Sequence, residues 1–144
     1  MSSAFMNTGA TIARVLLADD HAEILSQTGS VLAGEFEIVG SVGNGVDLIK
    51  AAAQLDPDVI VLDITMPGLD GIEAALRLKH SGCRAKLVFL SVHEDSDYVR
   101  AALQSGGIAY VIKARLASDL ITAIHEALEG HRFVSPTIGL EEEP

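Results

Sequence analysis

The sequence predicts one α/β domain built on a parallel β-sheet with helices on both faces. Five short apolar runs alternate along the chain with segments of helical spacing. Right-handed crossover connections turn such β-α repeats into a parallel sheet. The runs are almost continuously apolar, which is typical of strands that are covered on both faces. We therefore expect a doubly wound sheet of five parallel strands.

The five predicted strands are rich in β-branched and aliphatic residues, which favour strands in runs this short. In chain order they are "ARVLLAD" (13–19), "FEIVGSV" (36–42), "DVIVLD" (58–63), "KLVFLSV" (86–92) and "IAYVIK" (108–113).

Helices are predicted between the strands from apolar residues that recur every three or four positions. The first and last stripes are Ile24, Leu25, Thr28, Val31 and Leu32, and Leu120, Ile121, Ile124, Ala127 and Leu128. In "LDGIE", Asp70 is expected to cap a helix and Glu73 to complete a capping box. Ser118 is expected to cap the last helix.

The predicted elements all fall within residues 13–132, which we take as the folded domain. A chain of 144 residues is long enough to bury one hydrophobic core. We expect residues 1–12 to form a flexible N-terminal extension. Residues 133–144 are expected to be a tail or the start of a linker to a further domain.

Composition and charge exclude several classes of protein. No apolar run approaches the roughly 18 residues that span a membrane, and the N-terminus does not resemble a secretory signal. We therefore expect a cytoplasmic protein that does not contact membranes. The formal net charge of −10 disfavours direct binding to nucleic acid. The single cysteine, Cys83, excludes an intramolecular disulfide.

Polar residues stand at the ends of four of the five predicted strands. The first strand ends in Asp19 and Asp20, the third in Asp63, the fourth in Ser91 and the fifth in Lys113. In a doubly wound sheet, ligands bind beyond the carboxyl ends of the strands. We therefore expect three carboxylates, one hydroxyl and one amine to converge at this edge.

Crowded carboxylates repel one another, so such a cluster must retain protons or recruit a cation. Mg²⁺ suits a site with few protein oxygens and often works beside phosphate. A carboxylate can be the nucleophile that forms an aspartyl phosphate, while a metal and an ammonium group neutralise the phosphoryl oxygens. Asp63, Mg²⁺ and Lys113 would fill these roles.

Each of these residues also has an ordinary structural interpretation. Asp20 alone would be a helix cap or turn residue, Ser91 a strand-end hydroxyl and Lys113 a solvated charge. Their joint occurrence favours a functional site. The sequence has no GxxxxGK[ST] loop, and it lacks the second aspartate of a DxDxT phosphatase.

The chain resembles the receiver domains of bacterial two-component response regulators over about residues 13–132. The matching motifs are "LLADDH", "VIVLDITMPGLDG", "LVFLSVH" and "GGIAYVIK". The resemblance implies a flavodoxin-like, CheY-like (βα)5 fold with strand order 2-1-3-4-5. Ala114 stands where many receivers carry proline, so the cis peptide bond of those relatives is not implied here.

The resemblance implies that Asp63 accepts a phosphoryl group from a sensor histidine kinase or a small phosphodonor. Asp19, Asp20, Asp63 and the backbone carbonyl of Thr65 would hold Mg²⁺, with Mn²⁺ as a substitute. Ser91 would move toward the phosphoryl oxygens, Tyr110 would turn inward, and Lys113 would pair with the phosphate. Such a protein is a signalling phosphoacceptor, not an enzyme acting on outside substrates.

The C-terminal part of the chain resembles the NarL/FixJ/LuxR-type branch, whose receivers usually precede a helix-turn-helix domain. The expected output is therefore regulated transcription through a DNA-binding domain that this chain does not contain. Two alternatives stay open: a stand-alone receiver acting by protein contact or in a phosphorelay, and a metal-dependent phosphohydrolase. Homodimer formation on phosphorylation is also left open by the sequence.

Overall fold

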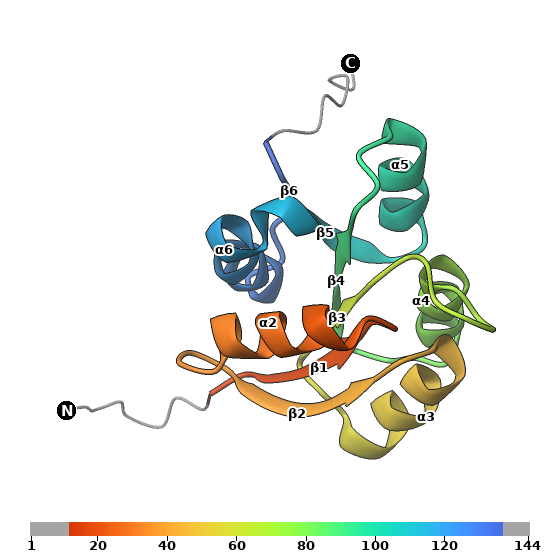
Figure 1. Cartoon of the computed structure of the whole chain (residues 1–144). Helices are drawn as coiled ribbons and strands as arrows, with labels where there is room; N and C mark the ends of the chain where they lie inside the picture. Colours follow the sequence, from red (N-terminus) through yellow and green to blue (C-terminus); the bar gives the residue numbers. More distant parts are fainter. Residues whose placement is uncertain (1–11, 137–144) are drawn as a thin grey trace.

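The computed structural model describes residues 12–136, which form a parallel sheet between two layers of helices (Figure 1). Its strands are β1 (Arg14–Ala18), β2 (Glu37–Val42), β3 (Val59–Leu62), β4 (Lys86–Ser91), β5 (Gly107–Ile112) and β6 (Phe133–Val134). Its helices are α2 (Ala22–Leu32), α3 (Gly45–Leu55), α4 (Gly71–His80), α5 (Ser96–Gln104) and α6 (Leu116–Leu128), with a short 3₁₀ turn, η1, at Lys113–Arg115.

All strand pairs are parallel, and the strand order is β2-β1-β3-β4-β5-β6. The doubly wound fold and the order of the first five strands are therefore as predicted. The prediction of five strands was wrong, because β6 pairs with β5 through Ala109 with Phe133 and Tyr110 with Val134. A two-residue strand is too short to show a hydrophobic period, and it lies in the stretch expected to be a tail.

The apolar strands are explained by burial on both sides of the sheet. Successive side chains of a strand point to opposite faces. In β3, Ile60 and Leu62 pack with helices α3, α4 and α5, whereas Val59 and Val61 pack with α2 and α6. All four side chains are almost fully buried. Figure 1 shows α2 and α6 together on one face, with α3, α4 and α5 on the other.

Short polar side chains cap the starts of α3, α4 and α5. The Asp70 carboxylate accepts a hydrogen bond from the Glu73 backbone N–H, which confirms the predicted cap of α4. The prediction for Ser118 was wrong, since α6 begins at Leu116. The Ser118 hydroxyl instead donates to the Arg115 carbonyl. Ser118 follows the turn η1, which continues directly into the helix and moves its start three residues earlier.

The regions predicted at the two ends fall mostly outside the described residues. Residues 1–11 and 137–144 are not described, so the expectations of a flexible extension and a tail are not addressed there. Within residues 12–136, no helix combines the length and apolarity needed to cross a membrane.

Candidate functional site

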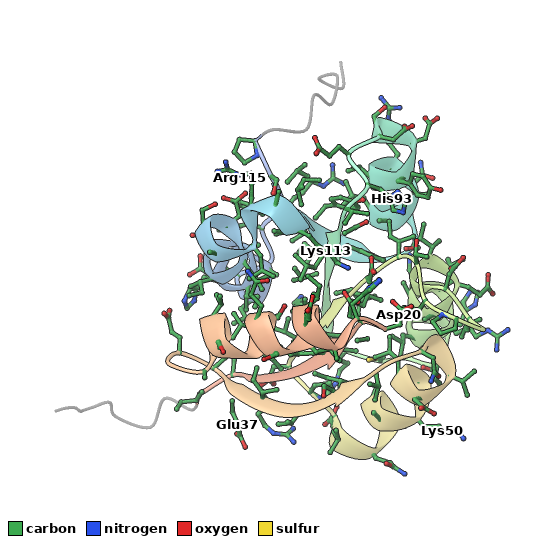
Figure 2. The ribbon with its side chains drawn as sticks, viewed as in Figure 1. Asp20, Glu37, Lys50, His93, Lys113 and Arg115 are labelled. Atoms are coloured by element: carbon green, nitrogen blue, oxygen red, sulfur yellow. The ribbon has the colours of Figure 1, made fainter. Side chains whose placement is uncertain are left out.

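The candidate site lies at the carboxyl edge of the sheet, where four strands end. Asp19 follows β1, Asp63 follows β3, Ser91 is the last residue of β4, and Lys113 follows β5. Figure 2 shows Asp20 and Lys113 at this edge, with His93 nearby on the side of α5. The parallel topology thus gathers residues that are far apart in the sequence.

The Lys113 ammonium lies between two buried carboxylates. Its Nζ is 2.8 Å from Asp19 Oδ2 and 3.0 Å from Asp63 Oδ2. The three side chains are at most 8% exposed. Such a pair of carboxylates tolerates burial because a cation compensates their charge.

The pKa values reflect this competition between burial and charge. Burial raises the pKa of Asp63, the contact with Lys113 offsets part of that rise, and the charge of Asp19 adds to it. For Lys113, burial acts to lower the pKa, but the two neighbouring carboxylates outweigh it and the pKa is raised. Lys113 is therefore a firmly held cation, positioned against the Asp63 carboxylate.

The acidic cluster has the chemistry of a divalent cation site. Asp19 Oδ2 is buried, and the Lys113 ammonium is its charged partner at 2.8 Å. Ligand atoms of Asp19, Asp20, His21 and Asp63 all lie within 4.8 Å of one another. Carboxylate oxygens gathered this closely fit a hard divalent ion.

His21 is the N-cap residue of α2 and contacts both neighbouring acids. Its ring Nδ1 is 3.0 Å from Asp19 Oδ1 and 3.1 Å from Asp20 Oδ1. Its backbone N–H also donates to Asp19 Oδ1. His21 therefore joins the start of α2 to the acidic cluster.

His93 connects three of the predicted site residues. Its backbone N–H donates to the Ser91 hydroxyl over 3.1 Å, and its carbonyl accepts from the Tyr110 hydroxyl over 2.8 Å. Its ring Nε2 is 3.1 Å from the Thr65 hydroxyl. The ring also stacks on Tyr98, with centroids 4.1 Å apart. His93 thereby ties the loop after β4 to the loop after β3.

Tyr110 is fully buried, and its ring stacks with Phe89 at a centroid distance of 6.3 Å. Burial raises the pKa of Tyr110, so its hydroxyl stays protonated and can donate to His93. The ring is therefore turned inward in this structure.

Comparison with known proteins identifies the family to which this fold belongs. Residues 15–125 match the sequence profile of the response regulator receiver domain. The chain is 33% identical over 128 residues to the nitrate/nitrite response regulator protein NarL of Escherichia coli, covering 88% of this chain and 59% of NarL. It is 32% identical over 127 residues to the response regulator GacA of Pseudomonas aeruginosa, covering 87% of this chain and 59% of GacA.

A solved structure agrees with these matches. A LuxR-family two-component response regulator from Aurantimonas superposes with a TM-score of 0.84 and 27% identity, covering 89% of this chain and 93% of that one. This chain belongs to the response regulator receiver family. The predicted family and its NarL/LuxR-type branch are thus confirmed. The receiver spans 59% of the length of these two curated relatives.

One feature of this receiver could not be predicted from the sequence. The role of His93 depends on contacts with Thr65 and Tyr110, which are 28 and 17 positions away. No local pattern marks such a residue. The Lys113–Ala114 peptide bond is trans, as are all peptide bonds among the described residues.

Proposed function

We propose that this receiver is a phosphoacceptor that takes a phosphoryl group on Asp63 in a Mg²⁺-dependent transfer. The donor is a sensor histidine kinase or a small phosphodonor, and the modification switches the signalling surface of the domain. The observation that carries this proposal is the buried triad of Asp19, Asp63 and Lys113 at the sheet edge, within the cluster of carboxylates that includes Asp20.

In the transfer from a phosphohistidine, an Asp63 carboxylate oxygen attacks phosphorus. The P–O bond to Asp63 forms as the P–N bond breaks, and the electron pair stays on the leaving imidazole nitrogen. Asp63 Oδ1 is oriented by the Ile64 backbone N–H at 2.7 Å, and Oδ2 faces Lys113. The carboxylate is therefore fixed before the donor arrives, which lowers the entropic cost of the step.

Asp19, Asp20, Asp63 and the backbone carbonyl of Thr65 would hold Mg²⁺, or Mn²⁺ in its place. When bound, the ion supplies positive charge to the phosphoryl oxygens.

Three further residues act on the phosphoryl group or behind it. Lys113 pairs with the phosphoryl oxygens. Ser91 donates its hydroxyl to them, and the same oxygen can still accept from the His93 backbone N–H, because a hydroxyl donates and accepts at once. Tyr110 stays inward behind Ser91, on β5 beside β4 (Figure 1).

Replacing Lys113 with alanine is expected to leave phosphate or its mimic bound but to weaken the conformational response. The reason is that Lys113 links the phosphoryl group to the end of β5, whereas Asp63 carries the bond itself. With two tyrosines and no tryptophan, the Tyr110 ring signals in NMR spectra report the response. Lys50→Ala, an exposed lysine on α3, is the control. An unchanged tyrosine response in Lys113→Ala would show that this role is wrong.

The proposed output is regulated transcription in the cytoplasm, through a LuxR-type helix-turn-helix domain outside this chain. Support comes from the relatives, which are response regulators longer than this receiver. The receiver itself, with its net charge of −10, would contact partner proteins and neither nucleic acid nor membrane. Homodimer formation through the switched surface is part of the same proposal.

Incubation with acetyl phosphate tests the proposed function directly. We expect intact mass to show one phosphoryl group per chain in the presence of Mg²⁺ and none when the metal is chelated. Turnover of general phosphate esters should not occur, which separates a phosphoacceptor from a phosphohydrolase. Labelling that is independent of a divalent metal would contradict the proposal.

A further inference from the structure

A buried polar network joins the end of β5 to the residue that follows β6. The Ser135 hydroxyl accepts from the Ile112 backbone N–H over 3.1 Å and donates to Asp119 Oδ2 over 2.8 Å. The Ser135 backbone N–H donates to the Tyr110 carbonyl over 2.9 Å. Ser135 is 1% exposed, so all three bonds lie away from solvent. We call these contacts of Ser135 with Tyr110, Ile112 and Asp119 the Ser135 clamp.

Asp119 anchors the Ser135 clamp as a buried charge. It lies in the first turn of α6, it is 5% exposed, and Arg115 binds it with Nε at 2.7 Å and Nη2 at 3.1 Å. The hydrogen bond from Arg115 is the main cause that lowers the pKa of Asp119, so the carboxylate is ionised at neutral pH. Figure 2 shows Arg115 at the end of the molecule where β6 ends. A charged acceptor makes the bond from Ser135 stronger than one between neutral groups.

The Ser135 clamp binds the C-terminal end of β5, next to the candidate site. Ile112, whose N–H it binds, directly precedes Lys113, and Lys113 contacts Asp19 and Asp63. The clamp also binds the carbonyl of Tyr110, and the Tyr110 hydroxyl donates to the His93 carbonyl. The end of β5 and the residue after it thus contact the site on one side and the clamp on the other.

The clamp holds β6 against β5, and β6 is the most weakly attached strand of the sheet. β6 has two residues, lies at the edge and pairs only with β5. Short edge elements with few buried contacts are the first to open in a folded protein. Release of β6 is therefore expected to cost less free energy than opening of any inner strand, and a small change in the order of β5 can shift the balance between its docked and released states.

We propose that Ser135 is a positioning residue through which the Asp63–Lys113 site controls the docking of β6 on β5. This rests on the proposed function. A phosphoryl group carries nearly two negative charges in place of the single charge of the Asp63 carboxylate that now faces Lys113, so it holds Lys113 and the end of β5 more strongly. That restraint holds the Ile112 N–H and the Tyr110 carbonyl in place for Ser135, so phosphorylation tightens the clamp. By linkage, the clamp raises the affinity of the site for a phosphoryl group by the same factor.

The test uses the full chain with Mg²⁺ and beryllofluoride, an unreactive phosphoryl mimic. In the wild type, beryllofluoride should slow the hydrogen exchange of the Ile112 and Ser135 amides. Ser135→Ala should bind beryllofluoride roughly fivefold more weakly or worse by isothermal titration, the low end of typical couplings. Ser105→Ala is the matched control. Its hydroxyl is similarly buried but bonds only the Ala102 carbonyl, so its beryllofluoride affinity should be unchanged.

The outcomes separate this inference from the proposed function. A wild-type protein with no response to beryllofluoride would overturn both. A response in the amides around Asp63, without any change at Ile112 and Ser135, would overturn the clamp alone. Equal affinities of Ser135→Ala and Ser105→Ala would do the same. If Ser135→Ala proves too unstable to titrate, the hydrogen exchange of the Ile112 and Ser135 amides in the wild type still tests the proposal.

Discussion

Replacing Asp63 with asparagine is expected to abolish phosphoryl labelling completely while leaving the protein folded. Asparagine has nearly the same shape, but its amide oxygen is not a nucleophile toward phosphorus, so neither acetyl phosphate nor a kinase can modify it. The loss should appear as an unmodified intact mass after long incubation with acetyl phosphate and Mg²⁺. Asp56→Asn is the matched control, since Asp56 is exposed and its positive φ of 48° is one that asparagine tolerates.

The same substitution should change how stability depends on pH. Burial raises the pKa of Asp63 above its value in the unfolded chain, so the folded state holds this proton more tightly. Asp63 therefore adds to the free energy of unfolding at low pH. This contribution is lost as the pH rises through the raised pKa of Asp63. The asparagine side chain cannot titrate, so in Asp63→Asn this decline should disappear from urea unfolding measured across that range. Persistent labelling, or an unchanged pH profile, would contradict the assigned role.

The fold was predictable because its main signals are local. Each strand from β1 to β5 lies within a predominantly apolar run, and alternating side chains of one run fill both layers of the core. The observed strands differ from the predicted ranges by no more than a residue at either end. β6 was missed because it is short and is held by Ser135, whose partners Asp119 and Ile112 are 16 and 23 positions away.

The site was predictable in part for the same reason. Asp19, Asp63, Ser91 and Lys113 stand at strand ends, and parallel topology alone brings strand ends together. The sequence does not predict which side chains contact one another at that edge of the sheet. The position of Lys113 between two carboxylates and the ties of His93 to Thr65 and Tyr110 depend on the paths of loops, which no periodic pattern encodes.

Gly71 illustrates a constraint on the site that the sequence does not reveal. The "LDGIE" stretch predicts the cap at Asp70, but it does not indicate why glycine follows. In the structure, the Gly71 N–H donates to the Ile64 carbonyl over 2.7 Å, and a Cβ atom on Gly71 would lie 1.9 Å from the Asp63 carbonyl oxygen. The start of α4 therefore packs directly against the backbone of Asp63, the proposed phosphoacceptor.

Gly71→Ala is expected to destabilise the receiver by about 3 kcal/mol, the upper end of the usual cost of overpacking. The clash is between backbone atoms and a Cβ, so no side-chain rotation relieves it. Relief requires the loop from Asp63 to Asp70 to move, so acetyl phosphate labelling should also slow. Urea unfolding measures the first effect and intact mass against time the second.

Gly29→Ala provides the matched control for the change of glycine to alanine. Gly29 lies inside α2, and no described atom would lie within 4 Å of the added Cβ. Alanine there should stabilise the protein by about 0.5–1 kcal/mol, because glycine loses more backbone freedom on helix formation. Opposite signs for the two variants would show that close approach to Asp63, and not helix propensity, fixes glycine at position 71. A Gly71→Ala protein as stable as the wild type would mean that the loop carrying Asp63 yields freely, and the site would then not be preorganised as proposed.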